Sequence, residues 1–238
     1  MAASQDFQRI RSLLQLTSTP VAMTFVEQQP AEVPRVAQRA PAACGYWPLA
    51  ASQSFYTTAE DELGCAVGAF THGVSLTPPQ MEELKSMVGT MLDLQYLQPD
   101  EVDRIPHRAS FAYCIYEPLD SAQREPDVVI VRGNASQMML LGEATRAAGS
   151  FRDGLSMGRP ACAMLPQALA SAQAVLSLGC VGNRVYTCLP VDEMYMALPG
   201  PQLAEIARRL ETIVAANATL RQFHRSRVPV AGGATAGA

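Results

Sequence analysis

Lysine is almost absent from this 238-residue chain, because Lys85 is the only lysine among the 18 basic residues. Schiff-base chemistry is therefore excluded everywhere except at Lys85, which lies in an ordinary amphipathic helical pattern. Net positive charge is also lacking, since the formal net charge is −4. This balance argues against a general nucleic-acid-binding protein, and we expect no nucleic-acid partner.

Long apolar runs are missing as well. The most apolar stretch, 161–178, is interrupted by Pro166 and by glutamine and serine residues, so no membrane-spanning helix is predicted. Residues 1–16 show neither a long apolar core nor a small-residue cleavage site, which excludes a secretory signal. We therefore expect a cytoplasmic protein without a membrane partner. Its six cysteines are then not expected to form structural disulfides.

Several catalytic motifs are absent. The chain has no H-E-x-x-H pair, no G-x-S-x-G elbow and no P-loop ending in Lys-Ser/Thr, which excludes a zincin, counts against an α/β-hydrolase and excludes a P-loop phosphate site. Only three histidines occur. His107 and His224 are in polar contexts and are expected to be exposed. His72 could reach a site near Cys65, but a loop histidine without a role is the more frequent case.

The chain has ample apolar residues for a core, at 48% of its length. Helical and strand patterns alternate without a repeat or a long linker, which predicts an α/β or α+β fold. We expect a single compact domain over residues 1–225, with a mixed sheet flanked by helices, and a flexible Gly/Ala tail at 226–238. The predicted helices cover 1–16, 44–53, 77–92, 134–148, 161–170 and a last segment from 201. The predicted strands cover 21–26, 54–58, 110–116, 127–131, 175–178, 184–189 and 194–198. The helix from Thr77 is expected to bury the stripe of Met81, Leu84, Met87, Val88, Met91 and Leu92.

The cysteines fall into two groups. Four stand beside glycine or alanine, where small neighbours would let the backbone approach a bulky sulfur-bound centre; these are Cys44, Cys65, Cys162 and Cys180. The other two, Cys114 and Cys188, lie in apolar strand-like runs, where a free cysteine behaves as a small hydrophobe.

Their spacing leaves several interpretations open. There is no C-x-x-C pair, so buried free thiols without a cofactor are as good a reading of the residues alone, and a redox dithiol is less favoured. The segment from Gly179 to Arg184 could present a thiol and backbone N–H groups to an anion, with Arg184 beside it. A plain turn with a surface arginine explains it equally well.

Taken together, these segments resemble the uncharacterised ArCR family, the domain of unknown function numbered 169. The resemblance spans roughly 13–210. It is carried by Thr19-Pro20-Val21-Ala22, by Gly64-Cys65-Ala66-Val67-Gly68-Ala69, by Pro126 to Val131 with Gly133-Asn134 and Gln137-Met138, and by Gly179-Cys180-x-Gly182-x-Arg184 with Asp192-Glu193-Met194 and Pro199. The family has no established activity to carry over. The resemblance implies that Cys44, Cys65, Cys162 and Cys180 belong to the family pattern, whereas Cys114 and Cys188 need not.

Our leading hypothesis is an iron–sulfur site, of the [4Fe–4S] type, held by Cys44, Cys65, Cys162 and Cys180 and serving a redox or substrate-binding role. These four cysteines should then face one cavity, with Arg184 at its rim. A metal-free binding module or regulator, in which Arg184 holds an anionic ligand, is the main alternative. Structural zinc is less favoured because closely spaced cysteine pairs are missing, and catalysis by one reactive thiol is a further reading. A small molecule or a redox protein is the expected partner, and a homo-oligomer is possible.

Overall fold

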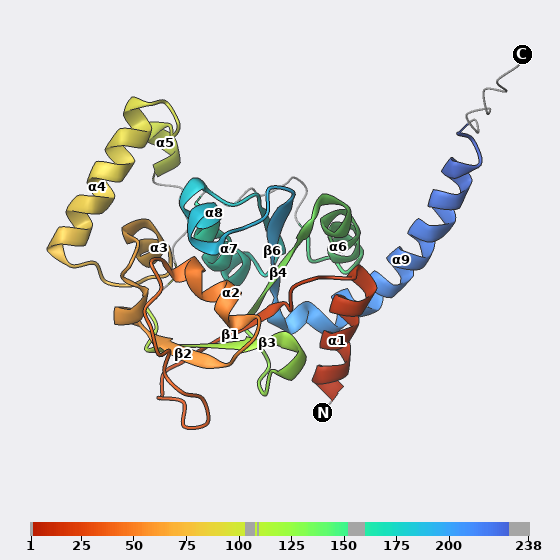
Figure 1. Ribbon diagram of the computed structural model, residues 1–238, viewed down its shortest axis with the longest axis horizontal. Coiled ribbons are helices and arrows are strands. Elements are labelled where there is room, and N and C mark those ends of the chain that lie inside the picture. Colours follow the sequence, from red (N-terminus) through yellow and green to blue (C-terminus); the bar gives the residue numbers. More distant parts are fainter. Residues whose placement is uncertain (1, 103–107, 109, 152–159, 229–238) are drawn as a thin grey trace, which may run out of the picture.

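The computed structural model describes residues 2–102, 108, 110–151 and 160–228. Within these residues six strands form one sheet in the order β2-β3-β1-β4-β6-β5, with helices on both faces (Figure 1). The strands are β1 (Val21–Val26), β2 (Phe55–Thr58), β3 (Tyr113–Pro118), β4 (Val128–Asn134), β5 (Val175–Ser177) and β6 (Glu193–Pro199). The helices are α1 (Ala2–Leu14), α2 (Tyr46–Ala50), α3 (Ala66–Thr71), α4 (Pro78–Asp93), α5 (Pro99–Val102), α6 (Ala135–Ala147), α7 (Met164–Ser171), α8 (Val181–Thr187) and α9 (Leu203–Arg225). Short 3₁₀ turns are η1 (Ala43–Gly45), η2 (Ala59–Glu62), η3 (Leu119–Ser121), η4 (Ala161–Ala163) and η5 (Gly200–Gln202).

The fold belongs to the α+β class, which is one of the two classes predicted from the sequence. Every pair of neighbouring named strands is antiparallel, where the sequence suggested a mixed sheet. The helices between strands therefore do not act as the crossovers that parallel strands require. The expected tail at 226–238 lies largely outside the described residues, which end at residue 228.

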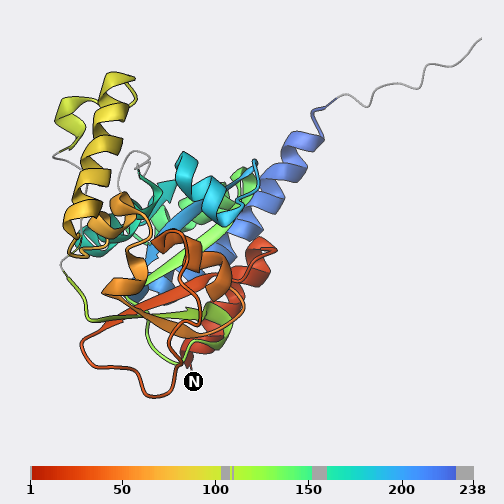
Figure 2. The same cartoon turned by 60° about the vertical axis from the view of Figure 1, so that its left-hand side comes forward.

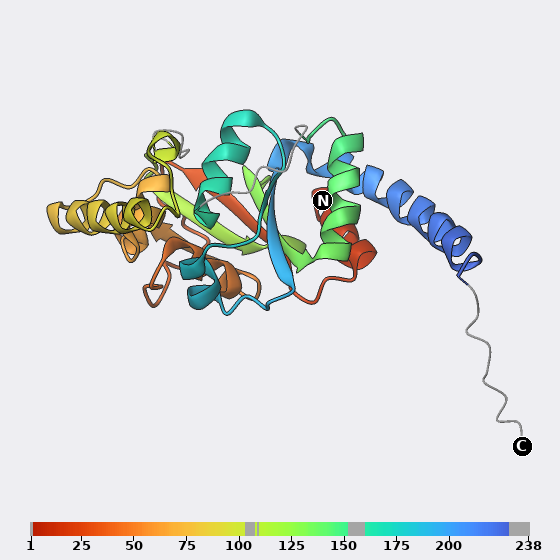
Figure 3. The same cartoon turned by 90° about the horizontal axis from the view of Figure 1, so that it is seen from above.

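Strand β4 shows how the core is divided between the two faces of the sheet. Val128 and Ile130 belong to one hydrophobic cluster, together with α2 and α7, and Val129 and Val131 belong to the other, together with α1, α6 and α9. Successive side chains of a strand point to opposite faces. The continuous apolar run of β4 thus follows from helices that cover both faces (Figure 3).

Helix α4 departs from the prediction. The sequence rule identified its start correctly, since Thr77 and Gln80 form a capping box and proline opens the helix. However, none of its residues is buried, and Met81 is exposed. The helix packs beside α3 and stands away from the sheet (Figure 2). Its apolar stripe therefore does not belong to the core.

The strand predicted over 184–189 is also wrong. Residues Val181–Thr187 form helix α8, and Cys188 follows it in a left-handed conformation with φ of 49°. Val185 and Cys188 are exposed. The β-branched and aromatic residues of this segment suggested a strand, but the turn at Gly179 and the cap at Cys180 start a helix instead.

Candidate functional site: a cavity lined by four cysteines

Cys44, Cys65, Cys162 and Cys180 line one cavity of about 420 Å³. They reach it from four different segments, which are η1, the start of α3, η4 and the start of α8. The predicted convergence on a shared cavity is thus observed. Cys44 and Cys162 are buried, and Cys65 and Cys180 are half-buried.

The cysteines share a local setting, because each stands at or just before the start of a helical segment. Cys65 is the N-cap residue of α3 and Cys180 is the N-cap residue of α8. The backbone N–H of Asn183 donates to Cys180 Sγ at 3.4 Å. The first turn of a helix leaves backbone N–H groups without partners, and these favour a negatively charged sulfur.

Glycines beside two of the cysteines are required by the backbone. A Cβ atom added at Gly64 would lie 2.7 Å from the carbonyl oxygen of Pro41, so only glycine allows this approach of two loops. Gly179 has φ of +81°, a left-handed conformation that favours glycine. These residues therefore shape the loops that carry Cys65 and Cys180. Their role is therefore different from the predicted one, which was to leave room around a sulfur-bound centre.

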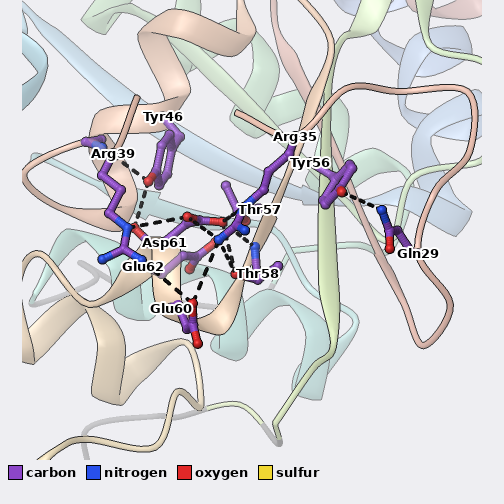
Figure 4. Close-up of polar contacts among 11 residues, drawn as sticks. Gln29, Arg35, Arg39, Tyr46, Tyr56, Thr57, Thr58, Glu60, Asp61 and Glu62 are labelled. Carbon is purple, nitrogen blue, oxygen red and sulfur yellow. Dashed lines mark hydrogen bonds and ion pairs between the residues drawn. The ribbon is translucent and has the colours of Figure 1, made fainter. Parts of the chain in front are cut away.

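A partly buried polar clamp joins the segments of Cys44 and Cys65 (Figure 4). The hydroxyl of Tyr46, two residues after Cys44, donates to the carbonyl oxygen of Asp61 at 2.7 Å. The Asp61 carboxylate in turn accepts two hydrogen bonds from Arg35, at 2.9 and 3.0 Å. Burial alone would raise the pKa of the Asp61 carboxyl. The hydrogen bonds from Arg35 outweigh this effect and help to hold the pKa below its ordinary value. The clamp therefore fixes η1 against the turn that leads into α3.

Burial dominates the electrostatics of the thiols. Burial raises the pKa of Cys44 to about 12, and the nearby Cys180 and Cys65 thiols contribute to the rise. The Asn183 amide, which faces Cys44 without hydrogen-bond geometry, opposes it in part. Burial also raises the pKa of Cys162 and of Cys65, again with contributions from the neighbouring thiols.

The rest of the cavity wall is apolar. Helix α4 supplies Leu84, Met87, Val88 and Met91, so the stripe expected in the core faces the cysteines instead. Among the described residues that line the cavity there is no aspartate, glutamate, lysine, arginine or histidine. One polar side chain, Asn183, is buried there at 1% exposure, and its Nδ2 and Oδ1 have no hydrogen-bond partner.

Arg184 does not have the predicted position at the rim. It is not among the described lining residues, and its guanidinium donates to the carbonyl oxygens of Leu178, Pro190 and Glu193 at 2.6, 3.2 and 3.1 Å. These bonds tie α8 to the segments on either side of it. The charge that was expected to balance a bound anion is therefore used for structure.

The remaining candidates have other surroundings. Cys114 is fully buried in β3, as a core thiol should be, whereas Cys188 is exposed after α8. His72 is not an idle loop residue: it is buried at the end of α3, and its Nδ1 lies 2.7 Å from Glu62 Oε2. His224 is exposed, as expected, and His107 lies outside the described residues.

Sequence reasoning missed Asn183 and the role of α4. The signal for α4 was present, since its amphipathic stripe was recognised, but a pattern does not distinguish a core face from a cavity wall. For Asn183 the signal was its place three residues after Cys180.

A larger cavity, of about 560 Å³, lies between α1, α6 and α9, but its described lining has no cysteine, histidine or acidic residue.

Comparison with known proteins decides the family. The sequence model described as "Uncharacterised ArCR" matches residues 9–209. The chain belongs to the ArCR family. A relative, "Uncharacterized protein MJ0308" of Methanocaldococcus jannaschii, is 28% identical over 166 residues, which cover 67% of this chain and 70% of the relative. No solved structure matches the chain. All four cavity cysteines lie within the part of the chain that defines ArCR membership.

Two negative findings concern the described residues of this ArCR protein. No described helix combines the length and the apolar character needed to cross a membrane. No three described His, Cys, Asp or Glu side chains form a group that could hold a metal ion.

Proposed function

We propose that this ArCR-family protein binds a [4Fe–4S] cluster through Cys44, Cys65, Cys162 and Cys180. The observation that carries the proposal is the convergence of these four thiols, from four separate segments, on one cavity. Cys114 and Cys188, by contrast, are not among the described residues that line the cavity.

A cluster suits this arrangement better than a single zinc ion. Structural zinc draws four ligands to about 2.0–2.3 Å from one atom and usually recruits closely spaced cysteine pairs, which this sequence lacks. A [4Fe–4S] cluster takes one thiolate at each iron, so its ligand sulfurs stand roughly 6–7 Å apart. Thiols spread around a cavity are therefore compatible with a cluster.

The surroundings of the sulfurs support the same proposal. The backbone N–H groups of Val67 and Gly68 counteract the rise in the pKa of Cys65, and the N–H of Asn183 donates to Cys180. Hydrogen bonds to cluster sulfurs and exclusion of water are the means by which proteins set reduction potentials. Four cysteine ligands saturate four irons, so electron transfer is the role that this ligand set favours. We place the protein in the reducing cytoplasm, where free thiols persist.

Anaerobic reconstitution with iron and sulfide tests the proposal. The wild-type protein should take up about four iron and four sulfide per chain, the stoichiometry of one [4Fe–4S] cluster, and turn brown. Single Cys→Ser substitutions at residues 44, 65, 162 and 180 should each reduce the uptake strongly. Cys188→Ser is the matched control, because Cys188 is exposed and outside the lining, and it should behave as the wild type.

A second candidate function is metal-free binding of a small molecule. It is favoured by the apolar wall that α4 provides, which a cluster alone does not need. A protein that stays colourless after reconstitution, and whose Cys44→Ser and Cys180→Ser variants fold normally, would exclude the cluster and leave this candidate standing. An anionic ligand held by Arg184 is not part of it, because the Arg184 guanidinium is bonded to backbone carbonyls.

A further inference from the structure

The cavity offers more than a set of thiols, because its wall has a chemistry of its own. The cysteines come from η1, α3, η4 and α8, whereas α4 contributes only the hydrocarbon and thioether side chains of Leu84, Met87, Val88 and Met91. Small-molecule sites occupy roughly 300–1,000 Å³ and are mostly apolar with a few placed polar groups. The cavity, at about 420 Å³, has this size and this composition.

Charge narrows the class of ligand. None of the described residues that line the cavity carries a formal charge. An ion that left water for this space would lose its hydration without gaining a partner of opposite charge, which is strongly unfavourable. The described lining offers no positive charge to an anion, and a [4Fe–4S] cluster on four thiolates would add net negative charge beside the ligand, so a neutral molecule is favoured over an anionic one.

Asn183 supplies the polar contact. Its side chain lines the cavity and is 1% exposed, and neither Nδ2 nor Oδ1 has a hydrogen-bond partner. A buried amide left unpaired is costly, and native proteins pair such groups with protein, water or ligand atoms. The backbone of the same residue is already used, since its N–H donates to Cys180 Sγ. Among the described residues of the wall, the Asn183 side-chain amide is thus a buried polar group without a hydrogen-bond partner.

We propose that this cavity binds a neutral, mainly apolar small molecule, packed on the α4 side chains and hydrogen-bonded through one carbonyl, amide or hydroxyl group to the amide of Asn183. The site lies beside the four cysteines. Binding of the molecule does not depend on the cluster, but its role as an electron-transfer substrate rests on the proposed function.

A matched set of probes tests the proposal. The probes are 2-methylnaphthalene, 2-naphthamide and 2-naphthoate, which share one ring system and differ in a single group that is apolar, neutral polar or charged. We expect 2-naphthamide to bind the reconstituted protein most tightly, 2-methylnaphthalene more weakly by roughly tenfold, the effect of one hydrogen bond, and 2-naphthoate not at all. Calorimetry or ligand fluorescence gives the affinities.

Three variants separate the contribution of the Asn183 hydrogen bond to binding from that of packing on α4. Asn183→Ala should remove the preference for 2-naphthamide over 2-methylnaphthalene, and Asn183→Asp, which keeps the shape, should abolish binding of both. Val88→Trp should fill the α4 side and prevent binding. Gly89→Ala is its control on the same helix, because a Cβ atom there meets nothing within 4 Å, and it should bind as the wild type. Circular dichroism confirms that each variant is folded.

The outcomes distinguish this inference from the cluster proposal. Binding of 2-naphthoate as tight as that of 2-naphthamide, or no binding of any probe by iron-loaded protein, overturns the inference and leaves the cluster proposal standing. Selective binding of 2-naphthamide by protein that takes up no iron supports the inference and removes the cluster. Equal affinity of wild type and Val88→Trp would also overturn it, because the probes would then bind elsewhere.

Discussion

At the scale of single residues, the sequence identified the right cysteines for a partly wrong reason. Their small neighbours distinguished Cys44, Cys65, Cys162 and Cys180 from the other two. In the structure Gly64 permits a loop contact and Gly179 permits a left-handed turn. Both glycines still mark the site, because the loops that they shape carry the thiols.

The prediction that His72 has no role was wrong. Its partner, Glu62, lies in the turn before α3, and no short sequence motif indicates that contact.

The raised pKa of Cys44 predicts how the stability of the metal-free protein depends on pH. The folded-state pKa is about 12 against an ordinary value of 9.0. Between these values the unfolded chain has lost the thiol proton that the folded chain retains, so stability falls as pH rises, by about 1.4 kcal/mol per pH unit. Below pH 9 this contribution is fully present.

Urea unfolding at pH 8, 9, 10 and 10.5 measures this effect. The stability difference between wild type and Cys44→Ala should narrow as the pH rises above 9, because the variant lacks the titrating thiol. Cys188→Ala, at an exposed thiol outside the described cavity lining, is the matched control measured alongside. A constant difference for Cys44→Ala would show that Cys44 is not desolvated.

Glu62 is predicted to be a major contributor to stability. Its Oε1 accepts hydrogen bonds from Thr57 at 2.8 Å and Tyr116 at 2.9 Å, and its Oε2 lies 2.7 Å from His72. Glu62→Ala leaves three buried polar groups without this partner and should cost about 3–5 kcal/mol of unfolding free energy. Chemical denaturation measures it.

Glu60→Ala is the matched control two residues away. Glu60 is exposed and makes only long ion pairs, 3.9 Å to Arg35 and 3.7 Å to Arg39, so its loss should change stability by less than about 1 kcal/mol. Equal effects of the two substitutions would contradict the importance of the buried network.

At the scale of secondary-structure elements, caps and strands were predictable and the short helices were not. The capping boxes at Thr77 and Asn134 begin α4 and α6 where the sequence placed them. Helix α8 has seven residues, too few to show a helical period, and its β-branched residues suggested a strand. The burial of α4 was overestimated because its amphipathic stripe faces a cavity and not the sheet.

A substitution at Gly179 tests whether the turn before α8 places Cys180. A Cβ atom added there would lie 2.8 Å from Asn183 Oδ1, and the residue has φ of +81°. Gly179→Ala should therefore lower stability by about 1–2 kcal/mol and displace Cys180, which reduces iron uptake in reconstitution.

Gly142→Ala in α6 is the control for the same chemical change. Nothing lies within 4 Å of its added Cβ atom, so it should raise stability by up to about 1 kcal/mol and leave iron uptake unchanged. Thermal unfolding and iron analysis give both readouts. If Gly179→Ala behaved like Gly142→Ala, the turn would have no role in placing Cys180.

At the scale of the whole molecule, the sequence predicted the class of the fold but not the assembly of the site. Apolar runs identified the central strands, yet strand order and direction depend on contacts between distant segments, such as β1 with β4. The four cysteines span residues 44–180, and only the completed fold brings them to one cavity. The failure at Arg184 has the same origin, because its acceptors were not visible in the local sequence.

The shared sheet predicts cooperative unfolding. Strand β4 contributes alternate residues to both hydrophobic clusters, so neither cluster can come apart alone. Trp47, the single tryptophan, belongs to one cluster. Its fluorescence and far-ultraviolet circular dichroism should therefore give coincident denaturation curves for the metal-free protein. Separate midpoints would show that the two faces unfold independently.

The central claim, a cluster held by the four convergent thiols, is tested most directly by anomalous diffraction at the iron edge from crystals of anaerobically reconstituted protein. The account predicts one iron density in the cavity, in contact with the sulfurs of Cys44, Cys65, Cys162 and Cys180 and with no others. An empty cavity in protein that contains iron, or iron density bound by Cys188 or at the surface, would contradict it.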